Sequence, residues 1–253
     1  MNIFLIGAAG GVGRRLIPLL VTLGDDVTGM HRAAAQGDMI QRAGATPLAG
    51  DLISDSVKDL AGKMRGHDAV VFSAGAHGTG MEQTTRIDGK GLEKAARAAE
   101  EAGVPRFLLV SGFPEAGRQN DVSESFEHFK RVKKAADVYL ARRHLDWIIL
   151  RPGPLLDQPG SGYVSAGPAL EFAPVPREDV AAFIAAILHE HGTSHLIIEL
   201  TAGVTPIDQA VAHLARARDP RDPLLRGDHL TADRTQLSPG LSTPRGKTPR
   251  GRS

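Results

Sequence analysis

Residues 3–20, IFLIGAAGGVGRRLIPLL, join a short apolar run to a segment of helical period through a glycine-rich turn. Gly7, Gly10 and Gly13 stand at the spacing GxxGxxG. Such a turn needs residues without a Cβ, so that the backbone can bend sharply, approach a pyrophosphate and let the helix pack closely on the sheet. The phosphates then lie on the free N–H groups at the helix N-terminus. The stretch predicts a dinucleotide-binding unit; the alternative is a tight turn without a ligand.

The chain continues to alternate short apolar runs with segments of helical period until about residue 215. The apolar runs carry few polar residues, as strands do when helices cover both faces of their sheet. This alternation predicts βαβ units. We therefore expect an α/β fold, a Rossmann-like doubly wound parallel sheet, in a single domain over residues 1–218. The expected strands cover residues 2–6, 26–30, 45–49, 68–72, 106–110, 146–150 and 195–200, and the expected helices lie near 11–23, 36–43, 54–63, 82–102, 121–144, 178–190 and 206–218.

Two segments depart from this alternation. Residues 152–177 are rich in Gly and Pro, so we expect a small irregular insert on the substrate side of the sheet. Residues 219–253 lose all periodicity and gather Pro, Gly, Arg and Thr, which is the composition of a disordered tail. We expect this tail to be a solvated appendage; contact with RNA or an acidic partner is the alternative.

The composition limits the kinds of partner. Thirty Lys and Arg balance twenty-nine Asp and Glu, which gives no broad electrostatic attraction for nucleic acid or an anionic membrane. The chain has no cysteine, which excludes disulfides and thiolate chemistry and fits a reducing compartment. No stretch approaches the roughly 20 apolar residues of a membrane span. We expect a cytoplasmic protein whose partner is a small-molecule substrate; the sequence does not predict the oligomeric state.

Further stretches follow the glycine turn in a recognisable order. They are GDL at 50–52, VVFSAGAHG at 70–78, IDGKGLEKAARAAEEAGVPRFLLVS at 87–111, LDWIILRPGPL at 145–155 and VPREDVAAFIAAIL at 175–188. Together they resemble the atypical branch of the short-chain dehydrogenase/reductase superfamily, which includes sugar-epimerase-like and biliverdin/flavin-reductase-like proteins. The resemblance runs from residue 1 to about 213.

This resemblance implies positions for each part of an NAD(P) cofactor. The pyrophosphate would lie on the glycine turn, the adenine beside residues 51–52, the adjacent ribose beside residues 73–75 and the nicotinamide beside residues 152–153. The implied binding residues are Gly7, Ala8, Gly10, Gly11, Val12, Gly13, Asp51, Leu52, Ser73, Ala74, Gly75, Pro152 and Gly153.

The end of the second expected strand indicates which dinucleotide binds. An NAD site usually has Asp or Glu there, because a carboxylate accepts both ribose hydroxyls. Here Met30 and His31 occupy those positions, and Arg32 follows directly. A guanidinium suits a 2′-phosphate, and Arg14 could add a second positive charge. We predict NADP(H) rather than NAD(H); the alternative is that Arg32 is an ordinary solvated residue.

Residues 128–137, HFKRVKKAAD, resemble the motif HYxxxKxxAD of the superfamily's catalytic helix. In that family the Tyr hydroxyl donates or accepts the substrate's proton, and the Lys lowers the Tyr pKa and holds the nicotinamide ribose. Phe129 occupies the Tyr position and Lys133 the Lys position. Ser111 corresponds loosely to the family's catalytic Ser. The helix thus keeps the lysine but lacks the usual acid.

Other readings of this helix remain open. Lys133 could belong to a solvated basic face with its neighbouring lysines. Tyr139 could be a displaced catalytic Tyr, but ten residues of helix separate it from position 129 by about 15 Å, so we expect it to pack. His128 could relay a proton, although it directly precedes Phe129 and therefore lies on a different face of the helix from Phe129. The histidines of HEHGTSH, residues 189–195, lack zinc-binding spacing, and we predict no metal.

These observations favour an NADPH-dependent oxidoreductase that transfers hydride to a small, planar acceptor. Lys133 and Ser111 are its candidate catalytic residues. An NADP(H)-binding redox sensor without turnover is the first alternative, because the missing Tyr permits it. A sugar-nucleotide epimerase-like enzyme is the second, but it predicts a larger substrate domain than residues 152–177 can form.

Overall fold

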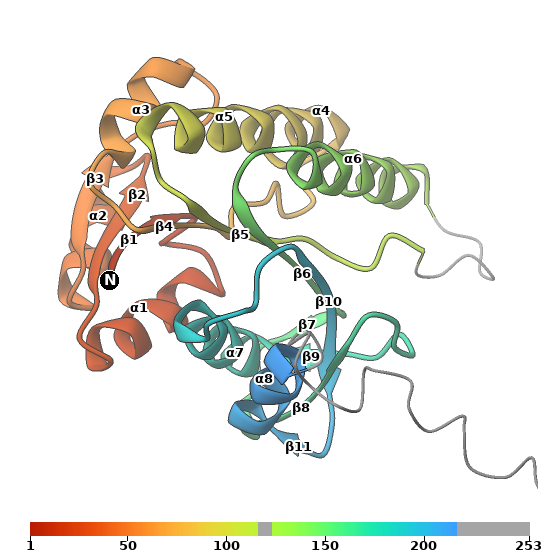
Figure 1. Cartoon of the computed structure of the whole chain (residues 1–253). Helices are drawn as coiled ribbons and strands as arrows, with labels where there is room; N and C mark the ends of the chain where they lie inside the picture. Colours follow the sequence, from red (N-terminus) through yellow and green to blue (C-terminus); the bar gives the residue numbers. More distant parts are fainter. Residues whose placement is uncertain (116–122, 217–253) are drawn as a thin grey trace, which may run out of the picture. The chain divides into compact units, whose positions relative to one another are not determined.

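A sheet of nine strands forms the centre of the protein in the computed structural model, which describes residues 1–115 and 123–216 (Figure 1). Seven strands run parallel and match the seven expected ones to within two residues, which confirms the doubly wound fold. In spatial order they are β3 (Thr46–Ala49), β2 (Asp26–His31), β1 (Asn2–Ile6), β4 (Ala69–Phe72), β5 (Arg106–Val110), β6 (Asp146–Pro152) and β10 (Leu196–Ala202). The expected tail at 219–253 lies outside the described residues.

The insert at 152–177 is more regular than its composition predicts. It contains β8 (Tyr163–Gly167), which pairs antiparallel with β10, and β11 (Thr205–Pro206) pairs with β8 at the sheet edge. It also contains β7 (Leu155–Leu156) and β9 (Val175–Pro176), which form a separate two-stranded sheet. The rest of the insert is irregular, as expected, and these strands were missed because short edge strands flanked by Gly and Pro resemble loops in composition.

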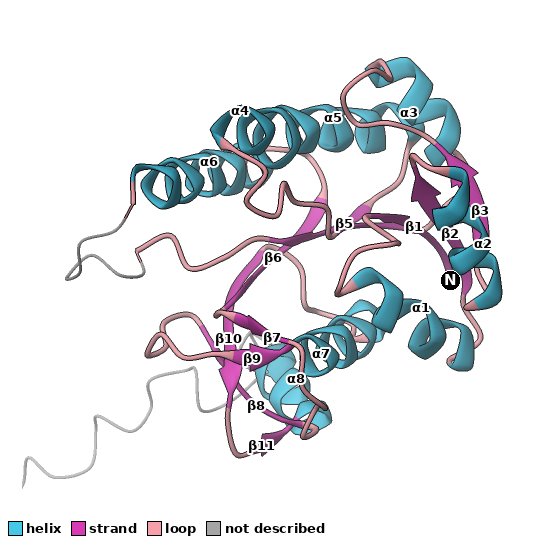
Figure 2. Ribbon diagram, turned by 180° about the vertical axis from the view of Figure 1, so that it is seen from behind, coloured by secondary structure: helices cyan, strands magenta, loops and turns pink. Residues whose placement is uncertain are grey.

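Helices cover both faces of the sheet, as the two opposite views show (Figures 1 and 2). One face carries α3 (Val57–Met64), α4 (Met81–Thr84), α5 (Leu92–Ala102) and α6 (Glu124–Ala141). The other carries α1 (Gly13–Thr22), α7 (Arg177–His189) and α8 (Ile207–Arg216), while α2 (Ala34–Arg42) lies beside β3. Among the described residues, no helix is long and apolar enough to cross a bilayer.

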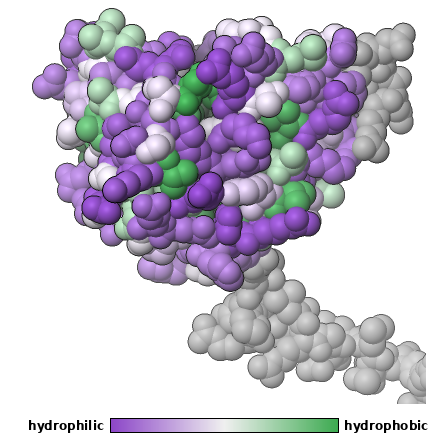
Figure 3. All heavy atoms as spheres, turned by 90° about the horizontal axis from the view of Figure 1, so that it is seen from above, coloured by the Kyte–Doolittle hydropathy of each residue, from purple (hydrophilic) through white to green (hydrophobic). Residues whose placement is uncertain are grey.

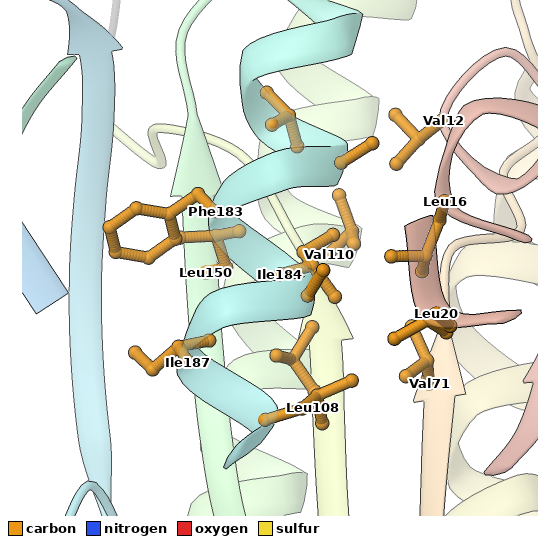
Figure 4. Packing of buried hydrophobic residues seen from close by; sticks show 14 of the residues in the cluster. Val12, Leu16, Leu20, Val71, Leu108, Val110, Leu150, Phe183, Ile184 and Ile187 are labelled. Atoms are coloured by element: carbon orange, nitrogen blue, oxygen red, sulfur yellow. The ribbon is translucent and has the colours of Figure 1, made fainter. Parts of the chain in front are cut away.

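The core between α7, α1 and the sheet shows how the apolar pattern becomes packing (Figure 4). Phe183, Ile184 and Ile187 of α7 recur at helical spacing and are fully buried. They lie among the strand residues Leu108 and Leu150 and others of this cluster. Each such side chain contributes about 1.5–3 kcal/mol on burial. The surface in Figure 3 is by contrast mostly hydrophilic, with scattered apolar residues.

The expected helix at 82–102 is interrupted by a π-helical segment, η1 (Thr85–Gly91), between α4 and α5. This segment, TRIDGKG, buries Asp88, which is 2% exposed. π-Helical turns are rare and often mark functional sites. The interruption matters here because η1 lies against α6, the helix that carries Lys133.

Candidate functional site

The glycine turn between β1 and α1 has no room for a side chain at Gly7 or Gly13. Gly7 has a φ of +88°, and a Cβ there would lie 2.6 Å from the Ala74 backbone nitrogen. A Cβ on Gly13 would overlap the Gly7 carbonyl oxygen and lie 2.8 Å from that of Ala8. The Gly10 N–H donates to Gly7 O at 2.9 Å, which closes the turn. The backbone thus forms a cradle of the kind that a pyrophosphate occupies.

Arg177, at the start of α7, lies across this turn. A Cβ on Gly11 would be 2.7 Å from its Cδ and Nε atoms. Its Nη1 atom is 3.0 Å from Leu155 O and 2.9 Å from Asp157 Oδ2. Arg14 and Arg15 also approach the Asp157 carboxylate, at 4.0 and 3.2 Å. Three guanidinium groups with one carboxylate leave the turn electropositive, which favours an anion.

A cavity of about 420 Å³ lies at the carboxyl ends of β1, β2 and β4. This is where the strand order reverses and where ligands of open α/β sheets bind. Arg32 lines this cavity from the end of β2, and Gln36 Oε1 accepts bonds from the Arg32 and Ala33 N–H groups at 3.1 Å. The structure brings together here Gly7, Gly10, Gly11, Arg32, Asp51, Leu52, Ser73, Ala74 and Gly75 of the predicted binding residues.

Asp51 has its carboxylate turned to its own loop. Its Oδ1 accepts from the Ile53 N–H at 2.8 Å, and its own N–H donates to Asp55 Oδ2 at 3.0 Å. Ala8 and Gly13 line neither this cavity nor the next one. Ala8 is buried in the core, and Gly13 lets α1 approach the turn. These two predicted residues therefore shape the cradle from beneath.

A second cavity of about 580 Å³ continues from the first, since Gly11, His77 and residues 73–75 line both. The remaining predicted residues meet here: Val12, Ser111, Lys133, Pro152 and Gly153. Gly153 is required, because a Cβ there would overlap the Ala173 carbonyl oxygen. The two cavities share lining residues and so form one continuous groove.

The outer walls of the second cavity are aromatic. Phe113 and Phe172 meet edge to face with centroids 5.3 Å apart, and Phe126 and Phe129 stack with centroids 6.2 Å apart. Such walls suit the faces and edges of a flat ring system. Only Phe129 was singled out from the sequence. The other three come from separate segments, so nothing in their spacing indicated that they would meet.

Lys133 is buried at the base of this cavity. Its Nζ atom lies 2.9 Å from Asp88 Oδ1 and 3.3 Å from Val110 O. Asp88 Oδ2 accepts from the Ala76 N–H at 2.9 Å. The alternative of a solvated basic face is therefore wrong for Lys133. Asp88 was missed from the sequence. The pattern predicted a regular helix at 82–102, and only the π-helical turn brings Asp88 to this position.

Ser111 belongs to a buried hydrogen-bonded row beside Lys133. Its Oγ donates to Asp137 Oδ1 at 2.6 Å, and Arg151 Nε donates to Asp137 Oδ2 at 2.9 Å. Burial raises the pKa of Asp137 above its ordinary value, and the Ser111 bond, Arg151 and Lys133 offset part of that effect. Asp137 and Arg151 were also missed from the sequence.

The other titratable groups considered from the sequence lie outside the groove. His128 Nε2 is 2.8 Å from Thr85 Oγ1 and lines neither cavity. The Tyr139 hydroxyl accepts from Arg143 Nη1 at 3.2 Å, and its ring packs against the core on the α5 side. This agrees with the expected packing role of Tyr139. His189 contacts Asp25 at 3.0 Å, away from the site.

Comparison with known proteins agrees with this geometry. The chain is 37% identical over 216 residues to the protein named uncharacterized sugar epimerase YhfK of Bacillus subtilis, covering 85% of this chain and 100% of the relative. A putative NAD-dependent epimerase/dehydratase from Bacillus halodurans has a similar structure, with a TM-score of 0.77, 31% identity and coverage of 84% and 99% of the two chains.

Two further structures are named as oxidoreductases. The oxidoreductase ylbE from Lactococcus lactis has a TM-score of 0.77 and 25% identity, covering 87% of this chain and 99% of its own. ChuY, an anaerobilin reductase from Escherichia coli O157:H7, has a TM-score of 0.67 and 25% identity, covering 80% and 97%. Residues 7–191 match the NAD(P)H-binding family. With the glycine cradle and the shared fold, this match identifies the chain as a member of the NAD(P)H-binding family, in the atypical short-chain dehydrogenase/reductase group.

Proposed function

We propose that the protein is an NADPH-dependent oxidoreductase that passes hydride to a small planar acceptor. The observation that carries the proposal is the aromatic cavity that opens from the nicotinamide end of the dinucleotide groove. Lys133 lies at the junction, where its ammonium would hold the nicotinamide ribose. Pro152 and Gly153 would border the nicotinamide ring, whose role when bound is to supply the hydride.

Several features support NADPH over NADH. Arg32 lines the adenosine half of the groove at the end of β2, within reach of a ribose 2′-phosphate. The acidic residue that lines the same cavity, Asp51, uses its carboxylate within its own loop. A carboxylate at Met30 or His31 would select the 2′-hydroxyl, and neither residue supplies one. The Arg177 guanidinium adds positive charge beside the pyrophosphate cradle.

The aromatic walls support a flat acceptor over a sugar nucleotide. The B. subtilis relative carries an epimerase name, whereas the E. coli neighbour is titled a reductase. A sugar requires several hydrogen-bonding partners, because its hydroxyls lose water on binding. Phe113, Phe126, Phe129 and Phe172 offer none. They offer instead the stacking surfaces that a flavin- or quinone-like ring prefers.

Phe129 also bears on the reaction. A carbonyl substrate needs a strong proton donor at the position of the missing Tyr hydroxyl. An acceptor such as a flavin or quinone has exposed heteroatoms, so it does not require a Tyr hydroxyl at that position. An NADP(H) sensor without turnover is the second candidate, and the same substitution favours it. We place the protein in the cytoplasm with a small-molecule partner, because the chain lacks cysteine and any excess of charge.

The test is oxidation of NADPH by the purified protein with FMN, riboflavin or a simple quinone as acceptor. Turnover that exceeds the uncatalysed rate, and that Phe172→Asp strongly reduces, would support the proposal. The same change at exposed Val204, which lies outside the groove, serves as the control. Tight NADPH binding without turnover for any acceptor would favour the sensor.

A further inference from the structure

Behind the wall of the groove lies a buried carboxylate that the proposed function leaves unused. Asp137, on α6 one turn after Lys133, is 2% exposed. Its contact toward the cavity runs through Ser111, whose Oγ lies 2.6 Å from Asp137 Oδ1. Ser111 itself lines the cavity beside Phe129 and Lys133. One hydroxyl thus separates a buried acid from the place where the acceptor would bind.

A hydroxyl and two charged groups face Asp137, and they help to set whether it holds a proton. Ser111 approaches from the end of β5, Arg151 Nε from β6 at 2.9 Å, and Lys133 lies one turn earlier on α6. Burial favours the neutral acid and outweighs these partners, which raises the Asp137 pKa. Arg151 cannot give up a proton, but it stabilises the carboxylate once the proton has left.

The second buried carboxylate of the site has a different task. Asp88 forms an ion pair with Lys133 at 2.9 Å and accepts from the Ala76 N–H at 2.9 Å. Its contacts therefore hold the lysine and the backbone. Of the two carboxylates, Asp137 is the one whose hydrogen bond leads to a hydroxyl on the cavity wall.

We propose that Asp137 is the proton reservoir of the site and that Ser111 delivers its proton to the acceptor, in place of the Tyr hydroxyl that Phe129 lacks. The inference rests on the proposed function. Asp137 does not touch the acceptor, so it is a positioning residue that acts through Ser111. When Asp137 carries the proton, its O–H donates to Ser111 Oγ, and the Ser111 O–H is free to point into the cavity.

The step balances without a further reactant. The acceptor takes a hydride, with its electron pair, from reduced nicotinamide and a proton from Ser111 Oγ. Ser111 regains a proton from Asp137 Oδ1, so that the hydroxyl is unchanged and Asp137 becomes a carboxylate beside Arg151. After the reduced product leaves, water in the open cavity returns a proton through Ser111 to Asp137. The sum is acceptor plus NADPH plus one proton, giving reduced acceptor plus NADP⁺.

The first experiment measures the protonation of Asp137 directly. The carboxyl carbons of the full-length protein, labelled with ¹³C-aspartate, are followed by NMR over a pH series, and the spectrum of Asp137→Asn assigns the signal. The proposal predicts that Asp137 takes up its proton well above the pH at which the exposed aspartates do. An Asp137 that titrates with those aspartates would overturn the proposal, whatever reaction the protein performs.

The second experiment measures NADPH oxidation by FMN and by a simple quinone in single turnovers over the same pH range. Asp137→Asn should slow the step about a hundredfold and remove its decline at high pH, since the reservoir is gone. Ser111→Ala should slow it equally, and the double variant should be no slower than either. Asp179→Asn, which changes an equally buried carboxylate outside the groove, should keep the wild-type profile.

The outcomes separate the two proposals. An unchanged rate and profile in Asp137→Asn would overturn the proton path while the oxidoreductase function stands. A wild-type protein that binds NADPH but reduces none of the acceptors would overturn both. Rescue of the Asp137→Asn profile by Asp137→Glu would further support the path, because a glutamate restores the acid.

Discussion

Lys133 Nζ lies 2.9 Å from Asp88 Oδ1, and both side chains are buried. This pair joins α6 to the π-helical segment η1 beside the second cavity. Lys133 Nζ also donates to Val110 O, so a third N–H remains for the nicotinamide ribose that we propose it holds. The lysine that the sequence assigns to cofactor binding is therefore held in place before any ligand arrives.

Removing one partner of this pair should cost stability. Lys133→Met leaves the Asp88 carboxylate buried and unpaired, which we expect to lower the free energy of unfolding by about 3–5 kcal/mol. Urea denaturation measures the loss. Adding Asp88→Asn should recover part of it, because the unpaired charge is gone. Lys134→Met, at the exposed neighbouring position, should cost no more than about 1 kcal/mol. Equal losses for the two lysines would contradict the buried pair.

The glycine cradle should not tolerate a methyl group. Gly13→Ala would force α1 away from the turn, because its Cβ would overlap the Gly7 carbonyl oxygen. We expect lower stability and a loss of NADPH affinity of more than tenfold, measured by calorimetry. Gly62→Ala in α3 is the matched control, since its Cβ would meet nothing within 4 Å. That change should be neutral or stabilising by about 0.5–1 kcal/mol. Unaltered NADPH binding in Gly13→Ala would count against the cradle.

A tyrosine hydroxyl at position 129 should add carbonyl reductase activity. Phe129 lines the cavity with its ring centroid 5.7 Å from Lys133 Nζ, so Phe129→Tyr would bring a hydroxyl near the lysine. A positioned acid contributes about 10²–10⁴-fold, and we expect carbonyl reductase activity to emerge with NADPH and a small ketone or aldehyde. Phe126→Tyr places a hydroxyl on the same wall one turn earlier and should not have this effect. Gain of activity in both variants, or in neither, would contradict the alignment of Phe129.

The raised pKa of Asp137 predicts how the free energy of unfolding changes with pH. A carboxyl whose folded pKa exceeds its unfolded value stabilises the protein fully below the unfolded pKa, about 3.9, and less as pH rises through the folded pKa. The difference in unfolding free energy between wild type and Asp137→Asn should therefore fall as pH rises from about 4 to 8. Urea denaturation across this range tests the sign. A difference that grows with pH would show that Asp137 is stabilised as a carboxylate.

The parts of the fold that follow from local pattern were predictable. Seven parallel strands and the helices between them have apolar periods that their burial explains, and the glycine spacing located the cradle. Strand β8 was not predictable in the same way. It pairs with β10 at an edge, half exposed, and its YVSAG sequence acquires strand structure only from that partner.

The residues of the site also fall into those that local sequence patterns indicate and those that only the tertiary fold brings together. Gly7, Arg32, Lys133 and Gly153 could be placed because each stands in a stretch with a recognisable spacing or order. Asp88 could not, since its burial depends on a π-helical turn that has no sequence period. Asp137 of α6 bonds to Ser111, and Arg151 of β6 bonds to Asp137. Contacts between separate elements do not show in the residue spacing of either element.

We propose that this groove binds NADPH with Arg32 on the 2′-phosphate. We would titrate wild type, Arg32→Ala and the control Arg42→Ala with NADPH and NADH, following nicotinamide fluorescence. Arg42 is exposed at the end of α2 and lines neither cavity. A charge-assisted bond is worth about 1.5–3 kcal/mol, so Arg32→Ala should weaken NADPH at least tenfold and leave NADH unchanged. Binding of neither nucleotide, or an equal affinity for both that Arg32→Ala does not alter, would contradict the proposed NADPH site.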